Sequence, residues 1–578
     1  MTGPAAPKDP EKARPFFYIL KDKDIFGERQ KDGTGIQFIY ESDGRLINSA
    51  QITGNVTDKE ELTLLETVEG FGRLVHSIGV SVETDRPEET AEFVFQMYGK
   101  KDLYGGGTNL TTSLKCDGLE HRIYLSDYRW TEDDHVPGQI KILFASPERM
   151  GKVSVRLFLN DGYEAPPEEE DLVIDMHSEE YCGMISRSLL QLGNPYRIRK
   201  AIEKSKAGKE VTLAYIGGSI TQGAGAIPIH TECYAYKSFQ LFQNRFSTQN
   251  NVRFIKAGVG GTPSELGMIR FDRDVLREGE RPDIVVIEFA VNDEGDETKG
   301  VCYESLVRKV LKLPWKPAVV LLFSVFANDW NLQERLRPVG DLYDLPMVSI
   351  RDAVTPQFSL KCGEGRILSK NQFFYDIFHP NNTGHTIMAD CLQYLFERCD
   401  AAEPARVGTF VEGMTEEQIL SEKLSGPAVI GADFERIFLL DKKNRYVGAK
   451  IRAGSFTSTD MELQSVEMDG NLIQTPEFPY NWMYDGSRPQ MAGFEMEIIC
   501  KSLFLIFKDS GEMDVGKANV FVNDVYCMTA DPHKNNWLHC NAVLLFWETE
   551  SRSHKVRIAV TEEDRNKKFT ILGFGYTI

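Results

Sequence analysis

The spacing of hydrophobic and polar positions changes twice along this chain, which divides it into three regions. Between about residues 36 and 159, short apolar or β-branched runs alternate with turns rich in Gly, Asp and Asn. The runs are GIQFIY, RLVHSIGVSVET, ETAEFVFQMYG, HRIYLSDY, GQIKILFAS and KVSVRLFLNDG. This pattern predicts an antiparallel β-sandwich or jelly roll. The acidic stretch APPEEED, residues 165–171, follows as a linker or a covering strap.

Between about residues 178 and 399, buried-type strands alternate with amphipathic helices. The strand-like runs are VTLAYI, VRFIKAG, DIVVIEFAV and PAVVLLFSVF, and helix-like segments cover residues 233–246 and 302–313. A last helix is expected at residues 382–398. This alternation predicts a parallel sheet with helices on both faces, which is the α/β class.

Beyond Thr409 the pattern returns to short strand-like runs separated by turns. We predict a second β-sandwich, again of the jelly-roll kind, in this region. The predicted domains are therefore residues 1–170, 171–403 and 404–578, and the two outer domains are the β-sandwiches.

Charge and hydropathy exclude several classes of protein. Of 578 residues, 66 are Lys or Arg and 86 are Asp or Glu, so the formal charge is −20. Nucleic acid and anionic membrane surfaces are therefore not expected as partners. No apolar run approaches the roughly 20 residues that a membrane helix needs. The first residues carry prolines and charges where a secretory signal has an apolar core, so we expect a cytoplasmic protein.

Neither the cysteines nor the glycine-rich stretches indicate a cofactor. Ten cysteines are scattered singly without a CxxC pair, which fits reduced thiols and argues against structural zinc. The stretch GGSITQGAG lacks the Lys-Ser/Thr of a P-loop, and residues 258–263 break the pattern GxGxxG at its last position. We therefore expect neither a metal nor a nucleotide.

The run VTLAYI ends in Gly217, Gly218 and Ser219, which puts a hydroxyl at the carboxyl end of a core strand. Ligands and catalytic groups collect at that edge of open α/β sheets. The alternative is a turn in which Ser219 only caps the next helix, because serine is a favoured N-cap. Three later stretches beside regular elements favour chemistry: AGVGGTPSELG, FAVNDEGDE and FYDIFHPNNTGH.

Together these four stretches contain the groups that acyl transfer needs. Ser219 is the predicted nucleophile, and His379 is the predicted base, since imidazole titrates near neutral pH. Asp376 lies three residues earlier and can orient the imidazole and stabilise its cation. The backbone amides of Ser219 and Gly261, with the side-chain amide of Asn292, form the predicted oxyanion hole.

The segments GGSITQG, AGVGG, FAVND and DIFHP resemble the serine, glycine, asparagine and histidine blocks of the SGNH (GDSL-type) hydrolase superfamily. The resemblance covers the central region, implies a flavodoxin-like three-layer α/β/α fold, and gives the five residues above the same roles. Two positions depart from the family pattern. Gly218 stands where many members have Asp, and Ala290 stands where many have Gly. Neither departure removes a functional group from the expected mechanism.

That superfamily contains lipases, thioesterases and carbohydrate esterases, so the fold alone does not identify a substrate. The flanking β regions are similar to those of bacterial esterases that remove acetyl groups from hemicellulose or other glycans. This similarity favours an acetylated oligosaccharide as the substrate. The alternatives are a lipid esterase or acyl thioesterase with the same chemistry, and a glycan-binding protein with an inactive centre. No oligomeric state follows from the sequence.

Two more side chains are candidates for substrate binding. Trp330 follows the strand PAVVLLFSVF and could stack on a sugar, although packing within a loop is the alternative. Arg270 lies nine residues after the glycine of the oxyanion hole and could reach toward the pocket. Its alternative is a surface ion pair with Asp272 or Asp274.

Three remaining features are weaker. His385 lies at the start of the last helix and is expected to be structural. The aromatic loops PYNWMYDG, residues 479–486, and NNWLHC, residues 535–540, could bind a glycan or close over the active site, or simply fill space in the third domain.

Overall fold

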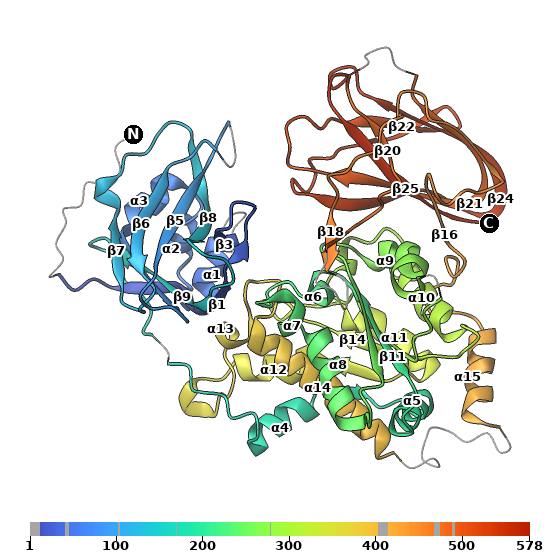
Figure 1. Cartoon of the computed structure of the whole chain (residues 1–578), viewed down its shortest axis with the longest axis horizontal. Coiled ribbons are helices and arrows are strands. Elements are labelled where there is room, and N and C mark those ends of the chain that lie inside the picture. Colours follow the sequence, from blue (N-terminus) through green and yellow to red (C-terminus); the bar gives the residue numbers. More distant parts are fainter. Residues whose placement is uncertain are drawn as a thin grey trace.

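The computed structural model of the chain describes residues 12–40, 45–101, 105–168, 170–277, 279–402, 414–467, 474–487 and 492–578. Figure 1 shows a blue β-rich part, a green and yellow part with helices around a sheet, and a red β-rich part. We call them the N-terminal sandwich (residues 12–168), the central part (residues 170–402) and the C-terminal sandwich (residues 414–578). The predicted boundary between residues 403 and 404 lies outside the described residues. Within the described ranges, no helix is long and apolar enough to cross a membrane.

The N-terminal sandwich consists of two antiparallel sheets with the orders β1-β9-β4-β7 and β2-β3-β8-β5-β6. Their strands are β1 (Phe16–Phe26), β2 (Glu28–Arg29), β3 (Gly35–Tyr40), β4 (Val75–Thr84), β5 (Thr90–Gly99), β6 (Asn109–Lys115), β7 (His121–Tyr124), β8 (Asp134–Phe144) and β9 (Met150–Leu159). Ile78 and Val155 from one sheet and Phe93 and Ile140 from the other are fully buried in one core. The predicted sandwich is therefore confirmed in this region.

The sequence pattern did not reveal β1 or the helices between β3 and β4. These helices are α1 (Arg45–Ile52), α2 (Lys59–Leu64) and α3 (Val68–Leu74), and a 3₁₀ turn, η1 (Leu125–Asp127), follows β7. Asp58 caps α2 by accepting a hydrogen bond from the backbone of Glu60 at 2.8 Å. Thr67 caps α3 by accepting from Gly70 at 3.0 Å. Each helix is too short to display a helical hydrophobic period clearly, so the caps are the main local signal of α2 and α3.

The central part contains one six-stranded sheet in the order β10-β15-β14-β13-β11-β12. Its strands are β10 (Leu189–Gln191), β11 (Val211–Gly217), β12 (Val252–Gly258), β13 (Ile284–Glu288), β14 (Ala318–Phe323) and β15 (Met347–Ser349). All neighbours are parallel except β10 and β15, which pair antiparallel. Without the edge strand β10, the order is the 2-1-3-4-5 of flavodoxin-like folds, as the sequence predicts.

Helices cover both faces of this sheet. They are α4 (Glu179–Ser186), α5 (Tyr196–Lys206), α6 (Ser219–Gln222), α7 (Ile229–Glu232), α8 (Tyr234–Phe246), α9 (Ser264–Phe271), α10 (Val301–Leu311), α11 (Gln333–Tyr343), α12 (Ile350–Phe358), α13 (Lys370–Phe373) and α14 (Asn382–Asp400), with short turns η2 (Asp272–Leu276), η3 (Asp293–Gly295) and η4 (Cys362–Glu364). Alternate residues of β11 belong to different cores: Leu213 and Tyr215 to one face, Ala214 and Ile216 to the other. The predicted three-layer α/β/α arrangement is therefore confirmed.

The C-terminal sandwich begins with α15 (Glu416–Ser425) and then forms one continuous antiparallel sheet in the order β16-β25-β21-β24-β22-β23, with β17 beside β21 and β20 beside β25. The strands are β16 (Phe438–Leu440), β17 (Ala449–Arg452), β18 (Ser465–Glu467), β19 (Gln474–Pro476), β20 (Trp482–Tyr484), β21 (Phe494–Asp509), β22 (Ala518–Val522), β23 (Val525–Ala530), β24 (His539–Val560) and β25 (Phe569–Thr577). β18 and β19 pair only with each other.

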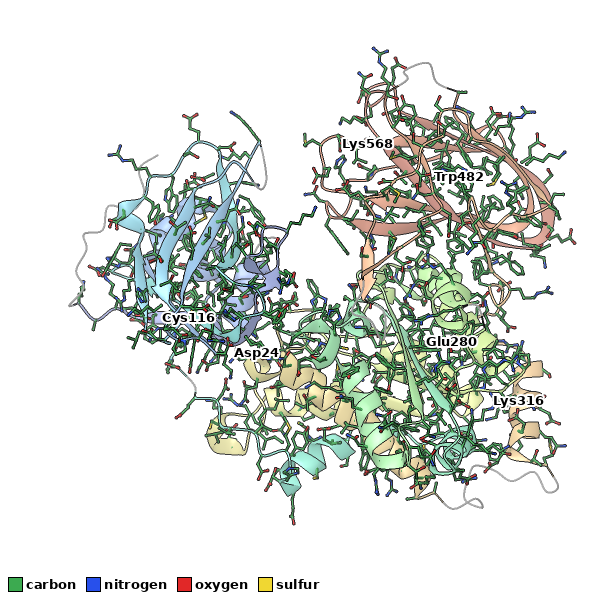
Figure 2. All side chains as sticks on the ribbon, viewed as in Figure 1. Asp24, Cys116, Glu280, Lys316, Trp482 and Lys568 are labelled. Atoms are coloured by element: carbon green, nitrogen blue, oxygen red, sulfur yellow. The ribbon has the colours of Figure 1, made fainter. Side chains whose placement is uncertain are left out.

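The long strands β21 and β24 make this sheet fold back on itself. β21 pairs with β17 through its first half and with β25 through its second half, and its register against β24 shifts between Cys500 and Ser502. Such irregularities let one strand bend from one layer into the next. Phe494, Leu505 and Ile571 are buried between the layers, and Trp482, labelled in Figure 2, packs there as well.

The C-terminal sandwich shares a hydrophobic core with the central part. Phe504 and Leu572 of the sandwich belong to the same buried cluster as Leu266 and Ile269 of α9. Apolar area removed from water stabilises such a junction by roughly 25 cal/mol per Å². These two parts therefore form one packed body.

The N-terminal sandwich meets the central part through more polar contacts. Lys23 on β1 is almost fully buried and donates a hydrogen bond to the backbone carbonyl of Phe374. Tyr375 packs against the core of the sandwich. Asp24, labelled in Figure 2, lies on the same strand, and burial raises the pKa of its carboxyl.

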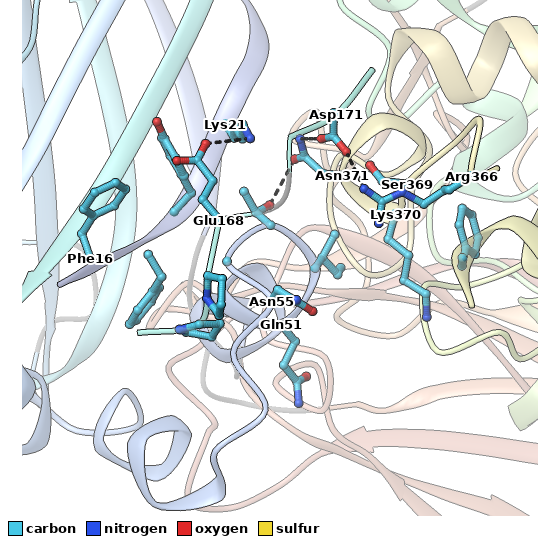
Figure 3. Close-up of a pocket in the computed structure, with 18 residues that line it drawn as sticks. Phe16, Lys21, Gln51, Asn55, Glu168, Asp171, Arg366, Ser369, Lys370 and Asn371 are labelled. Carbon is cyan, nitrogen blue, oxygen red and sulfur yellow. Dashed lines mark hydrogen bonds and ion pairs between the residues drawn. The ribbon is translucent and has the colours of Figure 1, made fainter. Parts of the chain in front are cut away.

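A cavity of about 130 Å³ lies between β1, the linker and the helices that follow β15. Figure 3 shows the linker crossing it, with Glu168 turned toward Lys21 and Asp171 turned toward Asn371 and Arg366. The Lys21–Glu168 ion pair measures 3.0 Å, and Arg366 lies 3.5 Å from Asp171. The linker therefore lies against both parts, as a covering strap does.

Candidate active site

Three of the residues that the sequence singles out follow the carboxyl ends of β11, β12 and β13. β11 leads to Ser219, β12 leads to the glycines at 260 and 261, and β13 leads to Asn292. Because β12 and β13 flank β11 on opposite sides, the chain leaves these strands in opposite directions. A crevice opens at such a switch point, and it is the usual ligand site of this architecture.

Two glycines let Ser219 follow the strand at this point. A Cβ on Gly217 would lie 2.2 Å from the hydroxyl of Thr221, and a Cβ on Gly218 would lie 2.1 Å from Oδ1 of Asn292. The Asn292 amide thus occupies the space that a side chain at position 218 would need. Gly218, not Ser219, holds the cap position of α6, and no side chain caps that helix. The Ser219 hydroxyl therefore does not cap this helix.

A chain of hydrogen bonds joins Ser219, His379 and Asp376. Ser219 Oγ lies 2.9 Å from His379 Nε2, and His379 Nδ1 lies 2.9 Å from Asp376 Oδ2. Asp376 Oδ1 also accepts a hydrogen bond from the backbone of His379 at 2.9 Å. The side chains of His379 and Asp376 are 18% and 17% exposed, so solvent reaches the site. This arrangement assigns the Nδ1–H tautomer to the imidazole, with Nε2 accepting from the serine hydroxyl.

The loop that carries the acid and the base is tied to the fold from several sides. The backbone amide of Tyr375 donates to the carbonyl of His379 at 2.9 Å. Asn381 caps α14 directly after the loop. His385 is fully buried, accepts from the backbone of Tyr234 and contacts the carbonyl of Ala224, and burial lowers its pKa to about 3. His385 is therefore neutral and structural, as expected.

Besides Ser219 itself, the predicted oxyanion groups are Gly261 and Asn292. Gly261 has a φ of +70°, a left-handed conformation that glycine adopts without strain. Oδ1 of Asn292 is buried and accepts no hydrogen bond within the described part of the chain. The Asn292 amide lies against Gly218, the residue before Ser219.

Side chains from the C-terminal sandwich contact the glycine loop; His539 belongs to the predicted aromatic loop of residues 535–540, whereas no motif in the sequence pointed to Gln464. Gln464 Nε2 donates to the carbonyl of Gly260 at 3.0 Å, and His539 Nε2 donates to the carbonyl of Gly261 at 3.0 Å. The indole of Trp537 lies 4.6 Å from the ring of His539 and is 43% exposed. Of the two predicted aromatic loops, residues 535–540 therefore lie at the site.

The other aromatic loop is placed differently. Trp482 and Tyr484 form β20 and are buried in the core of the C-terminal sandwich, where Trp482 packs on Phe494. Tyr480 is 44% exposed and lies under the ammonium of Lys443. Trp482 and Tyr484 thus fill space inside the sandwich, which was the alternative interpretation.

Arg270 does not reach toward a substrate. Its side chain is fully buried and donates to the carbonyl of Ala257 at 2.7 Å and to that of Gly217 at 2.8 Å, with Asp274 at 3.0 Å. The guanidinium therefore ties the ends of β11 and β12 together. Its partner carboxylate is the predicted Asp274, but the pair lies inside the protein, where the two strand carbonyls accept hydrogen bonds from the terminal nitrogens of the guanidinium.

Trp330 lies at the carboxyl rim and is partly buried. It stacks on Phe326 at 5.8 Å, Phe326 meets Phe378 edge-on at 5.0 Å, and Phe378 lies 6.2 Å from the imidazole of His379. Trp330 therefore ends a row of rings that begins at the base.

Three buried carboxyl groups lie under the site. Burial raises the pKa of Glu288 to about 7, of Asp293 to about 8 and of Glu265 to about 7. Glu288 ends β13 and accepts a hydrogen bond from Thr221 at 3.1 Å. Asp293 accepts from the backbone of Ser264 at 2.7 Å. Among the residues that the structure describes, no group of three or more His, Cys, Asp or Glu side chains could hold a metal ion.

Residues 215–387 match the model of the GDSL-like Lipase/Acylhydrolase family. Two solved structures of a two-domain esterase (CEX) active on acetylated mannans, one co-crystallized with mannopentaose, are each 24% identical to this chain. Each covers 68% of this chain and 98% of its own, with TM-scores of 0.55 and 0.53. Axe2, an acetylxylan esterase from Geobacillus stearothermophilus, is 18% identical over 34% of this chain and 97% of its own, with a TM-score of 0.26. No curated protein matches the chain.

Proposed function

Because residues 215–387 form a domain of the GDSL-like lipase/acylhydrolase family, we propose that this protein is a serine esterase that removes O-acetyl groups from carbohydrate. One observation carries the proposal: the unbroken hydrogen-bond chain from Ser219 Oγ through His379 to Asp376. In it a hydroxyl, an imidazole and a carboxylate have the mutual distances that nucleophilic acyl transfer needs.

In the proposed first half-reaction, Ser219 Oγ attacks the acetyl carbonyl carbon while its proton passes to His379 Nε2. The Asp376 carboxylate stabilises the imidazolium that forms. The carbonyl oxygen becomes an oxyanion and accepts hydrogen bonds from the backbone amides of Ser219 and Gly261 and from the Asn292 side chain. The bond to the sugar oxygen then breaks, and that oxygen takes the proton from His379.

The second half-reaction releases the acetyl group. Water attacks the acetyl-Ser219 carbonyl and gives a proton to His379, and the same donors stabilise the second oxyanion. When this intermediate collapses, Ser219 Oγ recovers its proton from His379 and acetic acid leaves, which ionises to acetate in water. The two steps balance without any further reactant.

A carbohydrate substrate is supported by the aromatic side chains around the serine. An indole that is 43% exposed, that of Trp537, lies against Gly261, and Trp330 ends the row of rings beside His379. Flat apolar rings with polar edges suit the alternating faces of a pyranose. The fold shared with an esterase active on acetylated mannans agrees with this choice.

Acetate release tests the proposal. Wild type should hydrolyse acetylated manno- or xylo-oligosaccharides, and Ser219→Ala should reduce kcat by about 10⁴-fold or more. Ser186→Ala is a matched control, because that exposed hydroxyl only bonds to the carbonyl of Gly183 in its own helix. Equal rates in wild type and Ser219→Ala would disprove the assignment.

The acyl-chain preference tests the other enzyme hypothesis. On p-nitrophenyl esters from acetyl to decanoyl, an acetyl-sized site should lose roughly 1 kcal/mol or more per misfit methylene. A preference for long chains would instead identify a lipid esterase or thioesterase. Glycan binding without hydrolysis of any ester would identify the binding protein with an inactive centre.

A further inference from the structure

We propose that Gln464 of the C-terminal sandwich is a positioning residue that aims the Gly261 N–H at the oxyanion. The inference rests on the proposed esterase function and adds to it a part of the machinery that lies outside the GDSL-like domain. In Figure 1, β18, which begins directly after Gln464, lies next to α6 of the central part. The C-terminal sandwich thus reaches the active-site end of the central sheet.

The argument starts from the planarity of the peptide bond. The carbonyl of Gly260 and the N–H of Gly261 belong to one peptide unit, in which the two groups are rigidly coplanar and point in opposite directions. Gln464 Nε2 donates to that carbonyl at 3.0 Å. Because the carbonyl is held toward the sandwich, the N–H points away from the sandwich within the same plane. One hydrogen bond therefore sets the direction of the oxyanion donor.

The side-chain amide of Gln464 can adopt only one orientation. Its Oε1 accepts from the backbone N–H of Cys540 at 2.9 Å, and a backbone N–H can only donate. The opposite end must then be the NH₂ group, which faces the Gly260 carbonyl. Gln464 is 7% exposed, so few water molecules compete for either bond. An amide that is satisfied at both ends in a buried place is a fixed support.

Two more side chains hold the neighbouring peptide units. Gln222 Oε1 accepts from the Gly260 N–H at 2.7 Å, and His539 Nε2 donates to the Gly261 carbonyl at 3.0 Å. Behind the imidazole, Asp509 lies 3.4 Å from Nδ1. Adjacent glycines have the widest backbone freedom of any residue pair, so an unsupported loop here would sample many directions of the N–H.

This support matters because an oxyanion donor accelerates the reaction only when it already points at the developing charge. Removal of a whole donor costs about 10²–10³-fold in kcat. A donor that is present but poorly aimed should cost less, so we expect a loss of roughly 10- to 100-fold when Gln464 loses its NH₂ group. The expected loss is in kcat, since the ground-state ester carbonyl uses this bond less than the oxyanion does.

Two variants test the role. Gln464→Leu removes both hydrogen bonds. Gln464→Glu keeps the shape and the acceptor for Cys540 but, as a carboxylate, cannot donate to Gly260. The control is Glu297→Ala, which removes another contact between the same two parts, the hydrogen bond from the backbone of Leu544. The substrates are p-nitrophenyl acetate and an acetylated manno-oligosaccharide, and methylboronic acid serves as a tetrahedral mimic that places an oxygen in the oxyanion hole.

Both Gln464 variants should lower kcat 10- to 100-fold with KM changed less than threefold. Each should weaken methylboronic acid binding by the same factor as kcat/KM, while Glu297→Ala changes neither. A smaller active fraction would lower kcat without changing the affinity for the mimic, so that result would overturn the positioning role. Full activity of Gln464→Glu would also overturn it, and would leave the esterase assignment intact. A wild type without Ser219-dependent hydrolysis would instead disprove the proposed function.

Discussion

The two β-sandwiches contact different parts of the proposed active site. The N-terminal sandwich contacts the loop of the acid and base, where Lys23 donates to the carbonyl of Phe374 and Tyr375 packs on its core. The C-terminal sandwich contacts the glycine loop, at Gly260 and Gly261, through Gln464 and His539. The two also differ in how they are attached. The C-terminal sandwich shares an apolar core with the central part, whereas the N-terminal one meets it across a polar cavity and a strap.

This difference shows that two similar domains can contribute unequally to the packing of a third. The hydrophobic pattern alone makes the outer regions look equivalent, since it predicts a series of short strands in both. Their contacts make the C-terminal sandwich part of the central body and leave the N-terminal one as an attachment with its own closed core. The following experiments test that asymmetry.

Deletion of each sandwich should have the largest and most unequal effects. A chain without residues 404–578 would expose the apolar side of α9, including Leu266 and Ile269, and should be insoluble or unfolded. A chain without residues 1–170 should fold and keep measurable esterase activity. Soluble yield, thermal unfolding and acetate release provide the comparison. A soluble and active protein without the C-terminal sandwich would contradict the claim that this sandwich is part of the central body.

Trp537→Ala tests whether the C-terminal sandwich also contacts the substrate. If the indole stacks on a sugar, its loss should raise KM for an acetylated oligosaccharide about tenfold, as about 1.4 kcal/mol of contact would. The KM for p-nitrophenyl acetate, which has no sugar, should stay within about twofold of the wild-type KM. Tyr526→Ala is the control, because Tyr526 is 55% exposed on the same sandwich. Equal effects on both substrates would remove Trp537 from the substrate site.

Lys23→Met tests the contribution of the N-terminal sandwich. Loss of a charge-assisted hydrogen bond to the Phe374 carbonyl should loosen the loop of Asp376 and His379 and lower kcat roughly three- to tenfold at constant KM. Lys21→Met is the matched control on the same strand, because Lys21 pairs with Glu168 of the linker instead. Should both variants be equally impaired, the effect would belong to domain docking and not to the loop.

The smallest expected effect comes from Glu288 and should not depend on either sandwich. Burial raises its pKa from 4.5 to about 7. The folded state therefore keeps a proton that the unfolded state has lost, and stability falls as pH rises between about 4.5 and 7. Glu288→Gln lacks this penalty, so its Tm relative to wild type should rise by about 3 °C from pH 5 to pH 7.5. The same gain is expected without residues 1–170. A constant difference across this pH range would contradict the assignment.

Much of the central part could be predicted because its signals are local. Buried strands alternate with helices, and each strand end carries its polar residues within a few positions, so Ser219 and Asn292 stand out in the sequence. Asp376 and His379 are three residues apart in one loop and were equally visible. Their distances agree with the predicted arrangement, and their catalytic roles remain a proposal.

The rest depends on contacts between distant segments, which no local pattern encodes. Gln464 reaches Gly260 across 204 positions, and Lys23 reaches Phe374 across 351. Arg270 was predicted to reach toward the pocket, with a surface ion pair as the alternative, yet its side chain is buried and bonds to two strand carbonyls and Asp274 inside the protein. The helices α1, α2 and α3 were missed because each is too short to show a helical period.

The shared core also has a consequence for the order in which the protein can be made. The ribosome completes the central sheet before it has produced Phe504 and Leu572, the residues that cover one of its helical faces. At about 5–20 residues per second, translation of residues 404–578 takes roughly 10 to 35 s. During that interval the nascent chain presents an uncovered apolar face beside a complete N-terminal sandwich. Chaperone binding during synthesis should therefore be strongest in this window, and slow translation of the last strands should lower the yield of folded protein.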